Sequence, residues 1–256
     1  MPEGDSVAGH ASRLRPILVG SEITDVGGSA PAVRANSPRI LDATVQGIRT
    51  VGKNLLIDLS GGYSIRVHLG MSGRWRVVPR GGQIPGSARL VLSTGGPIAV
   101  CSAAPTVEVD RTPAIDAGLS RLGPDPLGDF DPEEFIRRAR TQNSTAVGDV
   151  LLNQRVIAGI GNVYKSELLF LAGLDPHKPV DGVSDDHLRD IGADAVRLMA
   201  ANAGFASRTT TGSRAPDRET WVYGRPGRPC RRCGTAIEMD RQGDRVTYWC
   251  PSCQEL

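Results

Sequence analysis

Four cysteines near the carboxyl end of the 256-residue chain have the spacing of metal ligands. Cys230 and Cys233 form one Cys-x-x-Cys pair, and Cys250 and Cys253 form a second pair after sixteen intervening residues. Such pairs can place four thiolates around one tetrahedral ion, and the sequence between them is typical of two short strands joined by a turn. We therefore predict a zinc ribbon that holds one structural zinc ion. The alternative is a pair of disulfides, which the lack of a secretory leader disfavours.

The amino terminus offers a reactive group, because a zinc ion with four thiolate ligands has no open position for chemistry. If Met1 is removed, Pro2 presents a secondary amine. A terminal amine has a pKa of roughly 7.7 to 8.0, so more of it is uncharged at neutral pH than of a lysine near 10.4, and it can act as a nucleophile. Glu3 would lie beside it as a proton donor or acceptor. The alternative is that both are ordinary surface residues.

Two glycine-containing segments are candidates for phosphate binding. Lys53 is one of only three lysines and follows Gly52 at the start of an apolar run, where it could bind an anion or simply mark the entrance of a strand. Gly159 and Gly161 precede a predicted helix for which Asn162 is the expected cap. The free N–H groups at such a helix start form an anion site, although a tight turn between helices also requires glycine.

The rest of the sequence predicts an α+β chain of more than one domain. A helix is expected from Asp5 or Ser6 to about Leu18. Short valine- and isoleucine-rich runs broken by glycine pairs predict an all-β sandwich or barrel over residues 22–109, within which residues 29–42 are too polar to assign. Turn residues at 122–132 indicate a domain boundary. Helices are expected from 132 with Asp131 as cap, over 145–153, and over 184–203.

Composition indicates a folded, soluble protein. Hydrophobic residues make up 39% of the chain, which is ample for a core, and no apolar run is long enough to cross a membrane. Residues 1–20 carry charges where a signal peptide would be apolar, so we expect a cytoplasmic location. The net charge of +2 does not require a nucleic-acid partner. Residues 197–232, however, hold eight arginines against two acidic residues, which favours phosphate contact over a merely solvated surface.

Four separated segments together resemble those of a known family. They are Met1-Pro-Glu-Gly4, Gly52-Lys-Asn-Leu-Leu56, Ala158-Gly-Ile-Gly-Asn-Val-Tyr164, and the cysteine ribbon preceded by Val222-Tyr-Gly-Arg225. In this order they resemble the formamidopyrimidine-DNA glycosylase and endonuclease VIII family of bacterial base-excision repair enzymes, and most of all an actinobacterial endonuclease VIII paralogue. The resemblance covers nearly the whole chain. It implies an N-terminal two-sheet β-sandwich (1–121), a helix-two-turn-helix domain (122–221) and a zinc finger (222–256).

The resemblance also implies an activity, that of a bifunctional DNA glycosylase and abasic-site lyase. Pro2 would attack C1′ of an oxidised nucleotide flipped out of the stack, and Glu3 would transfer protons. The resulting iminium would permit strand cleavage by β,δ-elimination. Contacts to backbone phosphates would position the strand without reading sequence. The residues that match this role are Lys53, Gly161, Asn162 and Arg245.

Some segments depart from the family pattern. Met71, in His68-Leu-Gly-Met-Ser-Gly73, is the expected wedge that fills the gap left by a flipped nucleotide, with a buried core methionine as the alternative. Its usual Arg and Phe partners are replaced by residues 103–107, so duplex substrates are expected to be handled less well. Asp5-Ser6 replaces the more usual Pro-Glu, and the short, Ser-, Thr- and Arg-rich segment 204–221 favours oxidised pyrimidines over purines.

Two other hypotheses stay open from the sequence. The chain could be a non-catalytic zinc-ribbon protein that binds damaged or single-stranded DNA, which is favoured if Met1 is retained. Alternatively, the imine-forming amine could belong to Lys53 or Lys165. In each case the expected partner is damaged DNA, either duplex or single-stranded. We expect a monomer associated with the nucleoid and no membrane partner.

Overall fold

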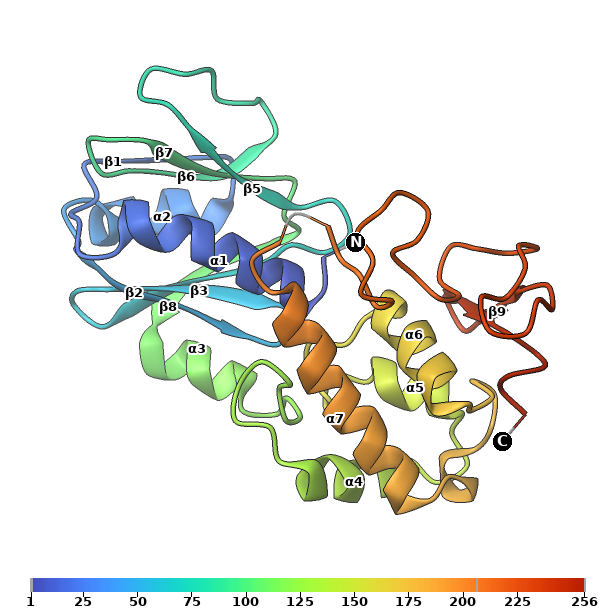
Figure 1. The fold of residues 1–256 in the computed structure, drawn as a ribbon. Helices are drawn as coiled ribbons and strands as arrows, with labels where there is room; N and C mark the ends of the chain where they lie inside the picture. Colours follow the sequence, from blue (N-terminus) through green and yellow to red (C-terminus); the bar gives the residue numbers. More distant parts are fainter. Residues whose placement is uncertain (1, 206, 256) are drawn as a thin grey trace. The chain divides into compact units, whose positions relative to one another are not determined.

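The computed structural model describes residues 2–205 and 207–255 and consists of two compact units, Met1–Arg121 and Leu122–Leu256. Figure 1 shows the chain from its N-terminal helix to its C-terminal hairpin. Because the fate of Met1 concerns a residue outside the described part, the prediction that it is removed stays a prediction. Among the described residues, no helix is both long and apolar enough to cross a bilayer.

The first unit is built on two antiparallel sheets of four strands each, in the orders β2-β3-β4-β8 and β1-β6-β7-β5. Side chains of both sheets meet in one core, to which Leu55, Ile65, Leu90 and Cys101 contribute. The predicted two-sheet β-sandwich is therefore confirmed. The strands are β1 (Asp25–Gly27), β2 (Val45–Val51), β3 (Asn54–Leu59), β4 (Tyr63–His68), β5 (Arg74–Val78), β6 (Ala88–Ser93), β7 (Ile98–Ser102) and β8 (Thr106–Arg111).

Three helices accompany these strands, α1 (Gly4–Leu18), α2 (Pro31–Ile40) and α3 (Thr112–Leu119). The helix α2 lies within residues 29–42, the stretch of the predicted all-β segment that the sequence left unassigned. Only Val33 and Ile40 of that helix are buried, so its apolar periodicity is too sparse to recognise. Pro31, with its fixed φ, begins the helix without losing a hydrogen bond.

The start of α1 lies one turn or less from the chain terminus. Glu3, rather than Asp5 or Ser6, occupies the N-cap position, and its carbonyl accepts the first helical hydrogen bond from the N–H of Val7 at 3.1 Å. The predicted cap is therefore wrong. The Asp5 carboxylate instead accepts the N–H of its own neighbour Ser6 at 2.6 Å, inside the first turn. The helix thus begins immediately after Pro2 and Glu3.

The second unit contains four α-helices and a single 3₁₀ turn: α4 (Pro132–Arg140), α5 (Val147–Leu152), α6 (Asn162–Ala172), η1 (Val180–Gly182) and α7 (Asp185–Asn202). The capping prediction for α4 is confirmed, because the Asp131 carboxylate accepts the N–H groups of Glu133 at 3.0 Å and Glu134 at 3.2 Å. Ser184 caps α7 in the same way, accepting the N–H of His187. Phe135, Leu169 and other apolar residues of these helices form a second core.

A two-stranded antiparallel hairpin completes the second unit. Its strands are β9 (Glu238–Gln242) and β10 (Arg245–Trp249), and Gly243, with φ of +57°, forms the two-residue turn together with Asp244. The strands predicted between the cysteine pairs are confirmed. The hairpin belongs to the same compact unit as the helices, and the separate domains 122–221 and 222–256 remain a prediction.

Candidate functional site

Pro2 and Glu3 lie at the end of the first unit where β2 ends, because α1 and β2 run antiparallel. The side chain of Arg15 donates to the carbonyl of Ile48 at 3.0 Å, and further along the chain the N–H of Gly20 donates to the carbonyl of Val45 at 2.8 Å. The contact thus moves forward from α1 into the residues that follow it, and backward along β2. The start of α1 must therefore point toward the end of β2.

The length of the helix carries the terminus to this end. Glu3 lies roughly 18 Å before Arg15 at 1.5 Å per residue, whereas Val51 ends its strand about 10 Å beyond Ile48. Pro2 is half-buried and the side chain of Glu3 is fully buried. If Met1 is removed as predicted, this buried carboxyl group would lie next to a terminal amine, where it could transfer protons. The sequence alone indicated this pair only weakly.

Lys53 lies in the tight turn at the same end of the unit. Gly52, with φ of +57°, and Lys53 form the two-residue connection between β2 and β3, and the side-chain amide of Asn54 donates to the carbonyl of Val51 across it at 3.1 Å. Asn54 pairs in turn with His68 on β4. Burial, followed by the charges of Lys53 and Arg66, lowers the pKa of His68 below its ordinary value, so this imidazole is neutral at neutral pH.

Met71 extends the same edge. It lies in the turn after β4 and its side chain is 70% exposed, which excludes the buried core methionine that the sequence left open. The preceding Gly70 has φ of +59°, and a Cβ there would meet Pro105 at 2.7 Å. The loop that lacks the usual Arg and Phe therefore packs its proline directly beneath the Met71 turn. Pro2, Glu3, Lys53 and Met71 are all positioned by elements that end on one side of the unit.

The start of α6 carries the second group of predicted residues. Gly161 is the N-cap and Asn162 is the first helical residue, so the prediction of Asn162 as the cap is wrong. The loop before it is held by Gln154, whose amide accepts the N–H of Gly159 at 3.1 Å and donates to the carbonyl of Ile160 at 2.9 Å. Gln154 was not singled out from the sequence. It shapes the helix start that the resemblance assigns to phosphate.

Asn162 is engaged with the hairpin instead. Its amide nitrogen donates to the carbonyl of Val246 at 2.6 Å, next to the predicted phosphate ligand Arg245 at the beginning of β10. An amide nitrogen carries two N–H groups, of which Val246 takes one. The structure thus brings Arg245 close to Gly161 and Asn162 within one unit, although Arg245 follows them by more than eighty residues in sequence.

Buried polar contacts fix the hairpin on the helices. The ammonium of Lys165, fully buried in α6, donates to the hydroxyl of Thr247 at 2.7 Å, and that hydroxyl donates to Gln242 at 3.1 Å. Gln242 donates to the carbonyl of Pro176 at 3.0 Å. Because Lys165 is fully enclosed and engaged in this way, it does not present an accessible amine. The alternative nucleophile at this position is therefore disfavoured.

Glu167 is a structural residue that sequence reasoning missed. Its fully buried carboxylate accepts the backbone N–H groups of Trp221, Val222 and Tyr223 at 2.7 to 2.9 Å, and the hydroxyl of Thr210 also donates to it. Burial raises the pKa of Glu167, and these four hydrogen bonds oppose the rise. The carboxylate fastens the segment before the finger to α6. No local signal reveals it, because its partners lie 43 to 56 residues away in sequence.

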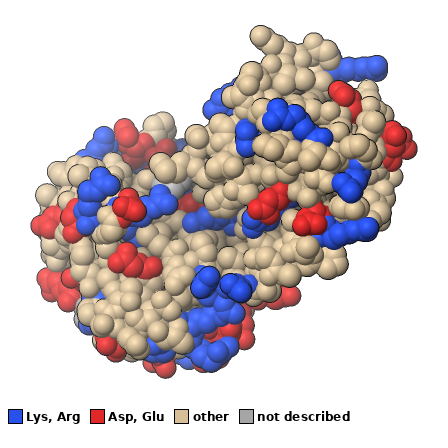
Figure 2. Space-filling view, turned by 180° about the vertical axis from the view of Figure 1, so that it is seen from behind, with Lys and Arg blue, Asp and Glu red and all other residues tan. Residues whose placement is uncertain are grey.

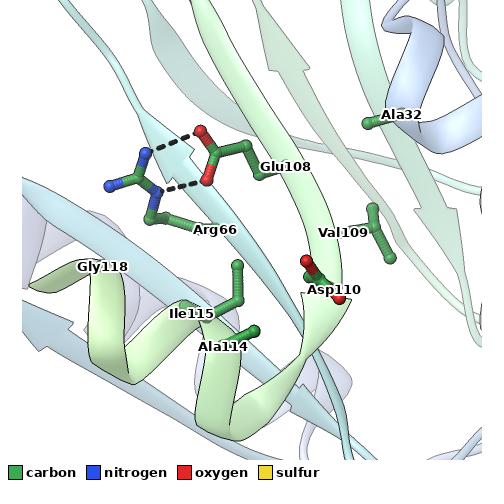
Figure 3. Close-up of a pocket in the computed structure, with 8 residues that line it drawn as sticks. All are labelled: Ala32, Arg66, Glu108, Val109, Asp110, Ala114, Ile115 and Gly118. Atoms are coloured by element: carbon green, nitrogen blue, oxygen red, sulfur yellow. Dashed lines mark hydrogen bonds and ion pairs between the residues drawn. The ribbon is translucent and has the colours of Figure 1, made fainter.

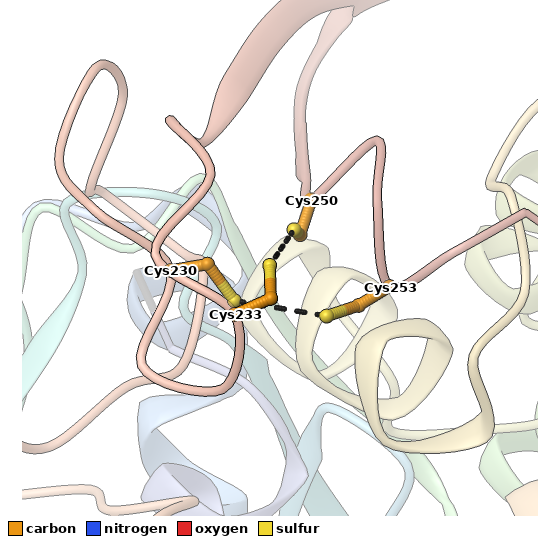
Figure 4. A group of neighbouring side chains, drawn as sticks. All are labelled: Cys230, Cys233, Cys250 and Cys253. Carbon is orange, nitrogen blue, oxygen red and sulfur yellow. Dashed lines mark hydrogen bonds between the residues drawn. The ribbon is translucent and has the colours of Figure 1, made fainter.

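The four cysteines form a cluster whose geometry fits a metal ion (Figure 4). Their sulfur atoms all lie within 4.8 Å of one another, with 3.9 Å between Cys230 and Cys253 and 3.5 Å between Cys233 and Cys250. A tetrahedron of metal–sulfur bonds of about 2.3 Å has edges of about 3.8 Å, whereas a disulfide would need about 2.05 Å. The cluster is therefore a structural metal site, and the disulfide alternative is wrong. Cys101, the fifth cysteine, is fully buried in the core as predicted.

The arginine-rich stretch is largely used within the second unit. Arg225 is buried and donates to the carbonyls of Trp221 and Pro229, and Arg232 lies over the ring of Phe170 at 4.4 Å. On the face seen in Figure 2, basic and acidic side chains are interspersed. Six of the eight arginines are nevertheless exposed, and the phosphate contact predicted for this stretch stays a prediction.

A cavity of about 410 Å³ lies elsewhere on the first unit, lined by residues of α2, β4, β8 and α3 (Figure 3). Arg66 and Glu108 form a two-bond ion pair on its wall, at 2.7 and 2.9 Å. None of the predicted site residues lines this cavity. This cavity therefore lies apart from the predicted site residues.

Comparison with known proteins agrees with this arrangement. Models of the formamidopyrimidine-DNA glycosylase N-terminal domain, of its H2TH domain, and of the zinc finger found in FPG and IleRS match residues 1–103, 122–212 and 227–256. A DNA-(apurinic or apyrimidinic site) lyase of Mycolicibacterium smegmatis is 41% identical, over 99% of each chain. The Streptomyces coelicolor protein named "Probable endonuclease 8 2" is 40% identical, over 99% of this chain and 94% of the relative.

A solved structure has the same fold. The Lactococcus lactis Fpg protein in complex with DNA containing N7-benzyl-Fapy-dG superimposes with a TM-score of 0.88 over the whole of both chains, at 24% identity. The chain belongs to the formamidopyrimidine-DNA glycosylase and endonuclease VIII family of zinc-finger DNA repair proteins. Within that family it is of the actinobacterial endonuclease VIII type, as the sequence motifs predicted.

Replacing Glu167 by glutamine should destabilise the second unit. The oxygen of the glutamine amide can accept from only some of the four donors, and the amide N–H groups would face the others. We therefore expect a loss of about 2 kcal/mol in the free energy of unfolding. Urea denaturation followed by circular dichroism measures this. Glu238→Gln, the same change at an exposed position in β9, is the control and should be neutral. Equal stability of the two variants would contradict the role of Glu167.

Proposed function

We propose that the chain excises oxidised bases, preferentially pyrimidines, and cleaves the resulting abasic site, with the amine of Pro2 as the nucleophile. The family to which the chain belongs consists of base-excision repair glycosylases and lyases, so a DNA-directed enzyme is the functional class. The observation that carries the residue assignment is the antiparallel packing of α1 on β2. It supports the gathering of Pro2, Glu3, Lys53 and Met71 at one end of the sandwich.

The proposed reaction uses one covalent intermediate. The lone pair of the Pro2 nitrogen forms a bond to C1′ as the bond to the damaged base breaks, and the base leaves with a proton. Opening of the sugar ring then gives an iminium, which draws electrons from the sugar and acidifies the C2′ proton. Loss of that proton expels the 3′ phosphate, and a second elimination expels the 5′ phosphate. Glu3, buried beside the amine, is the proposed carrier of these protons.

Phosphate contacts on both units would hold the strand for this reaction. Lys53 supplies a positive charge at the same end as the amine, while Gly161, Asn162 and Arg245 offer a helix start, an amide N–H and a guanidinium. Met71, exposed beside Pro105, is the proposed wedge. The substrate is damaged DNA, duplex or single-stranded, and a DNA substrate implies work at the nucleoid. Because one chain carries every group named, we expect a monomer.

The proposed metal is one structural zinc ion. Four thiolates in a tetrahedral cluster are the ligand set that zinc takes in closed structural sites. When bound, the ion stabilises the hairpin fold and leaves the chemistry to the protein's own groups.

Reduction with borohydride should trap the protein covalently on a strand that carries an oxidised pyrimidine. Pro2→Gly should yield less of this product, because it replaces the secondary amine by a primary amine on a more flexible residue. Glu3→Gln should lower excision of the base by roughly 10² to 10⁴, yet still be trapped on a pre-formed abasic site, where no base must leave. Trapping is measured by gel shift under denaturing conditions. If the parent protein, with Met1 removed, cannot be trapped on either substrate, it is a binding protein and the proposal is wrong.

Arg245→Ala and Lys53→Ala should each weaken DNA binding to a similar extent on all sequences. Removal of one phosphate contact lowers the slope of log affinity against log salt by about one unit. Fluorescence anisotropy at several salt concentrations gives this slope. Arg189→Ala is the matched control, because that guanidinium is already paired with Glu133 and Asp186. A slope equal to that of the parent would remove Arg245 or Lys53 from the phosphate site.

Native mass spectrometry should find one zinc ion per chain, and Cys250→Ser should lose it. Apparent zinc-binding energies of about 10 to 16 kcal/mol are folding energy in such units, so the variant should also unfold its hairpin. Cys101→Ser is the control, since that thiol lies in the core of the first unit and should leave the zinc content unchanged. Retention of zinc by Cys250→Ser would contradict the assigned ligand set.

A further inference from the structure

Phe205 differs from every other aromatic residue of the chain. The chain has four Phe, four Tyr and three Trp, all of which lie in the described part. Ten of them are buried or half-buried, whereas the side chain of Phe205 is 58% exposed. A single exposed apolar residue needs no explanation by itself. The surroundings of Phe205, however, form an organised structure.

The loop that carries Phe205 is closed by one buried side chain. Asn202, 2% exposed at the end of α7, accepts the N–H of Thr209 at 2.9 Å and donates to the carbonyl of the same residue at 2.7 Å. It also donates to the carbonyl of Leu198 at 2.8 Å. The N–H of Phe205 donates to the carbonyl of Asn202 at 3.1 Å. The backbone on both sides of the exposed ring is thus tied to the helix.

Arg214 is stacked on one face of this ring. The central carbon of its guanidinium lies 3.9 Å from the ring centroid. Its two terminal nitrogens donate to the carbonyls of Ser207 and Ala201, which hold the guanidinium in place. With Arg214 stacked on it, the residue is still 58% exposed, so part of the side chain is accessible to a ligand. A flat, electron-rich ring with a cation behind it suits another flat π system.

The loop also lies next to the proposed phosphate-binding helix start. Arg208 is placed over the ring of Tyr164, in the first turn of α6, with 4.9 Å between the guanidinium carbon and the ring centroid. Asn162 is two residues before Tyr164 in the same helix, and Gly161 is its N-cap. The exposed ring of Phe205 and the proposed phosphate site at the start of α6 lie on neighbouring elements of one unit. The ring suits the base of a nucleotide, and the helix start suits its phosphate.

We propose that Phe205 and Arg214 form a stacking platform for an unpaired base of the bound DNA. The inference rests on the proposed function, because it requires bound DNA. It adds a contact to a base, whereas Lys53, Gly161, Asn162 and Arg245 are proposed to contact phosphates. Stacking on an aromatic side chain tolerates any base, because each has a π face. A base loses its stacking neighbours when it leaves the duplex. The platform provides a new surface on which it can stack.

Binding to two unreactive oligonucleotides tests the platform. One is a single strand of thymidines, and the other has the same length and charge but carries tetrahydrofuran abasic analogues, so it offers phosphates without bases. The parent should bind the thymidine strand more tightly. Phe205→Ala should lower that affinity by roughly tenfold, which corresponds to about 1.4 kcal/mol, and leave the affinity for the abasic strand unchanged. Fluorescence anisotropy gives both constants.

Three further variants sharpen the result. Phe205→Trp should retain the preference for bases, and Arg214→Lys, which keeps the charge but loses the planar group, should reduce it. Met239→Ala removes an apolar side chain that is 50% exposed in β9 and should leave both affinities unchanged. Thermal melting and zinc content check that each variant is folded.

The proposal is overturned if Phe205→Ala changes both affinities equally or changes neither. The outcome is independent of catalysis, because neither oligonucleotide can react. A protein that shows the base preference but cannot be trapped with borohydride would retain the platform and lose the enzymatic proposal. The opposite combination would retain the enzyme and lose the platform.

Discussion

The proposed chemistry depends on the packing of α1 against β2. The helix runs antiparallel to the strand, so its start lies near the end of β2. The contacts of Arg15 with Ile48 and of Gly20 with Val45 fix the direction of α1 on β2, and the apolar side chains of α1 fix its depth in the core. The first residues of the chain would otherwise form a loose terminus. Here Glu3 is fully enclosed at the helix start, so the amine before it is held at one location on the sandwich.

A second constraint acts within the helical unit. The metal cluster folds the hairpin, but metal ligation alone would leave its direction open. Asn162, Lys165 and Glu167, within two turns of α6, bind respectively to β10, to Thr247 and to the segment before the first cysteine pair. One short helix therefore carries the proposed phosphate-binding residues at its start and also anchors the finger. A burial-driven core between Phe170, Val222 and Cys250 reinforces these polar contacts.

Those parts of the fold that rest on local rules were predictable from sequence. The cysteine spacing, the Asp131 cap with its proline, and the glycine turn of the hairpin each follow from residues close together in the chain. The helix α2 was not predictable, since only two of its side chains enter the core. Glu167 and Gln154 were missed because their importance lies in backbone groups that only the folded chain brings to them. The same holds for Asn162, which contacts the hairpin instead of capping its own helix.

The motifs that resembled a family supplied residue types, while the structure supplies their grouping. Pro2 and Lys53 are distant in sequence, and only the packing of α1 on β2 places them at one end of a sandwich. Met71 has the exposure required of a wedge, yet its neighbour is Pro105 where larger partners are usual. Substrate preference is therefore expected to differ from that of relatives with a complete plug.

The most direct measurement of the central claim is the location of the covalent bond. After borohydride reduction on abasic DNA, the complex is digested with protease and nuclease, and the modified peptide is sequenced by tandem mass spectrometry. The account predicts that the sugar remnant is attached to the nitrogen of Pro2 in the peptide that begins with Pro2-Glu-Gly. A remnant on the side chain of Lys53 or Lys165 would contradict it.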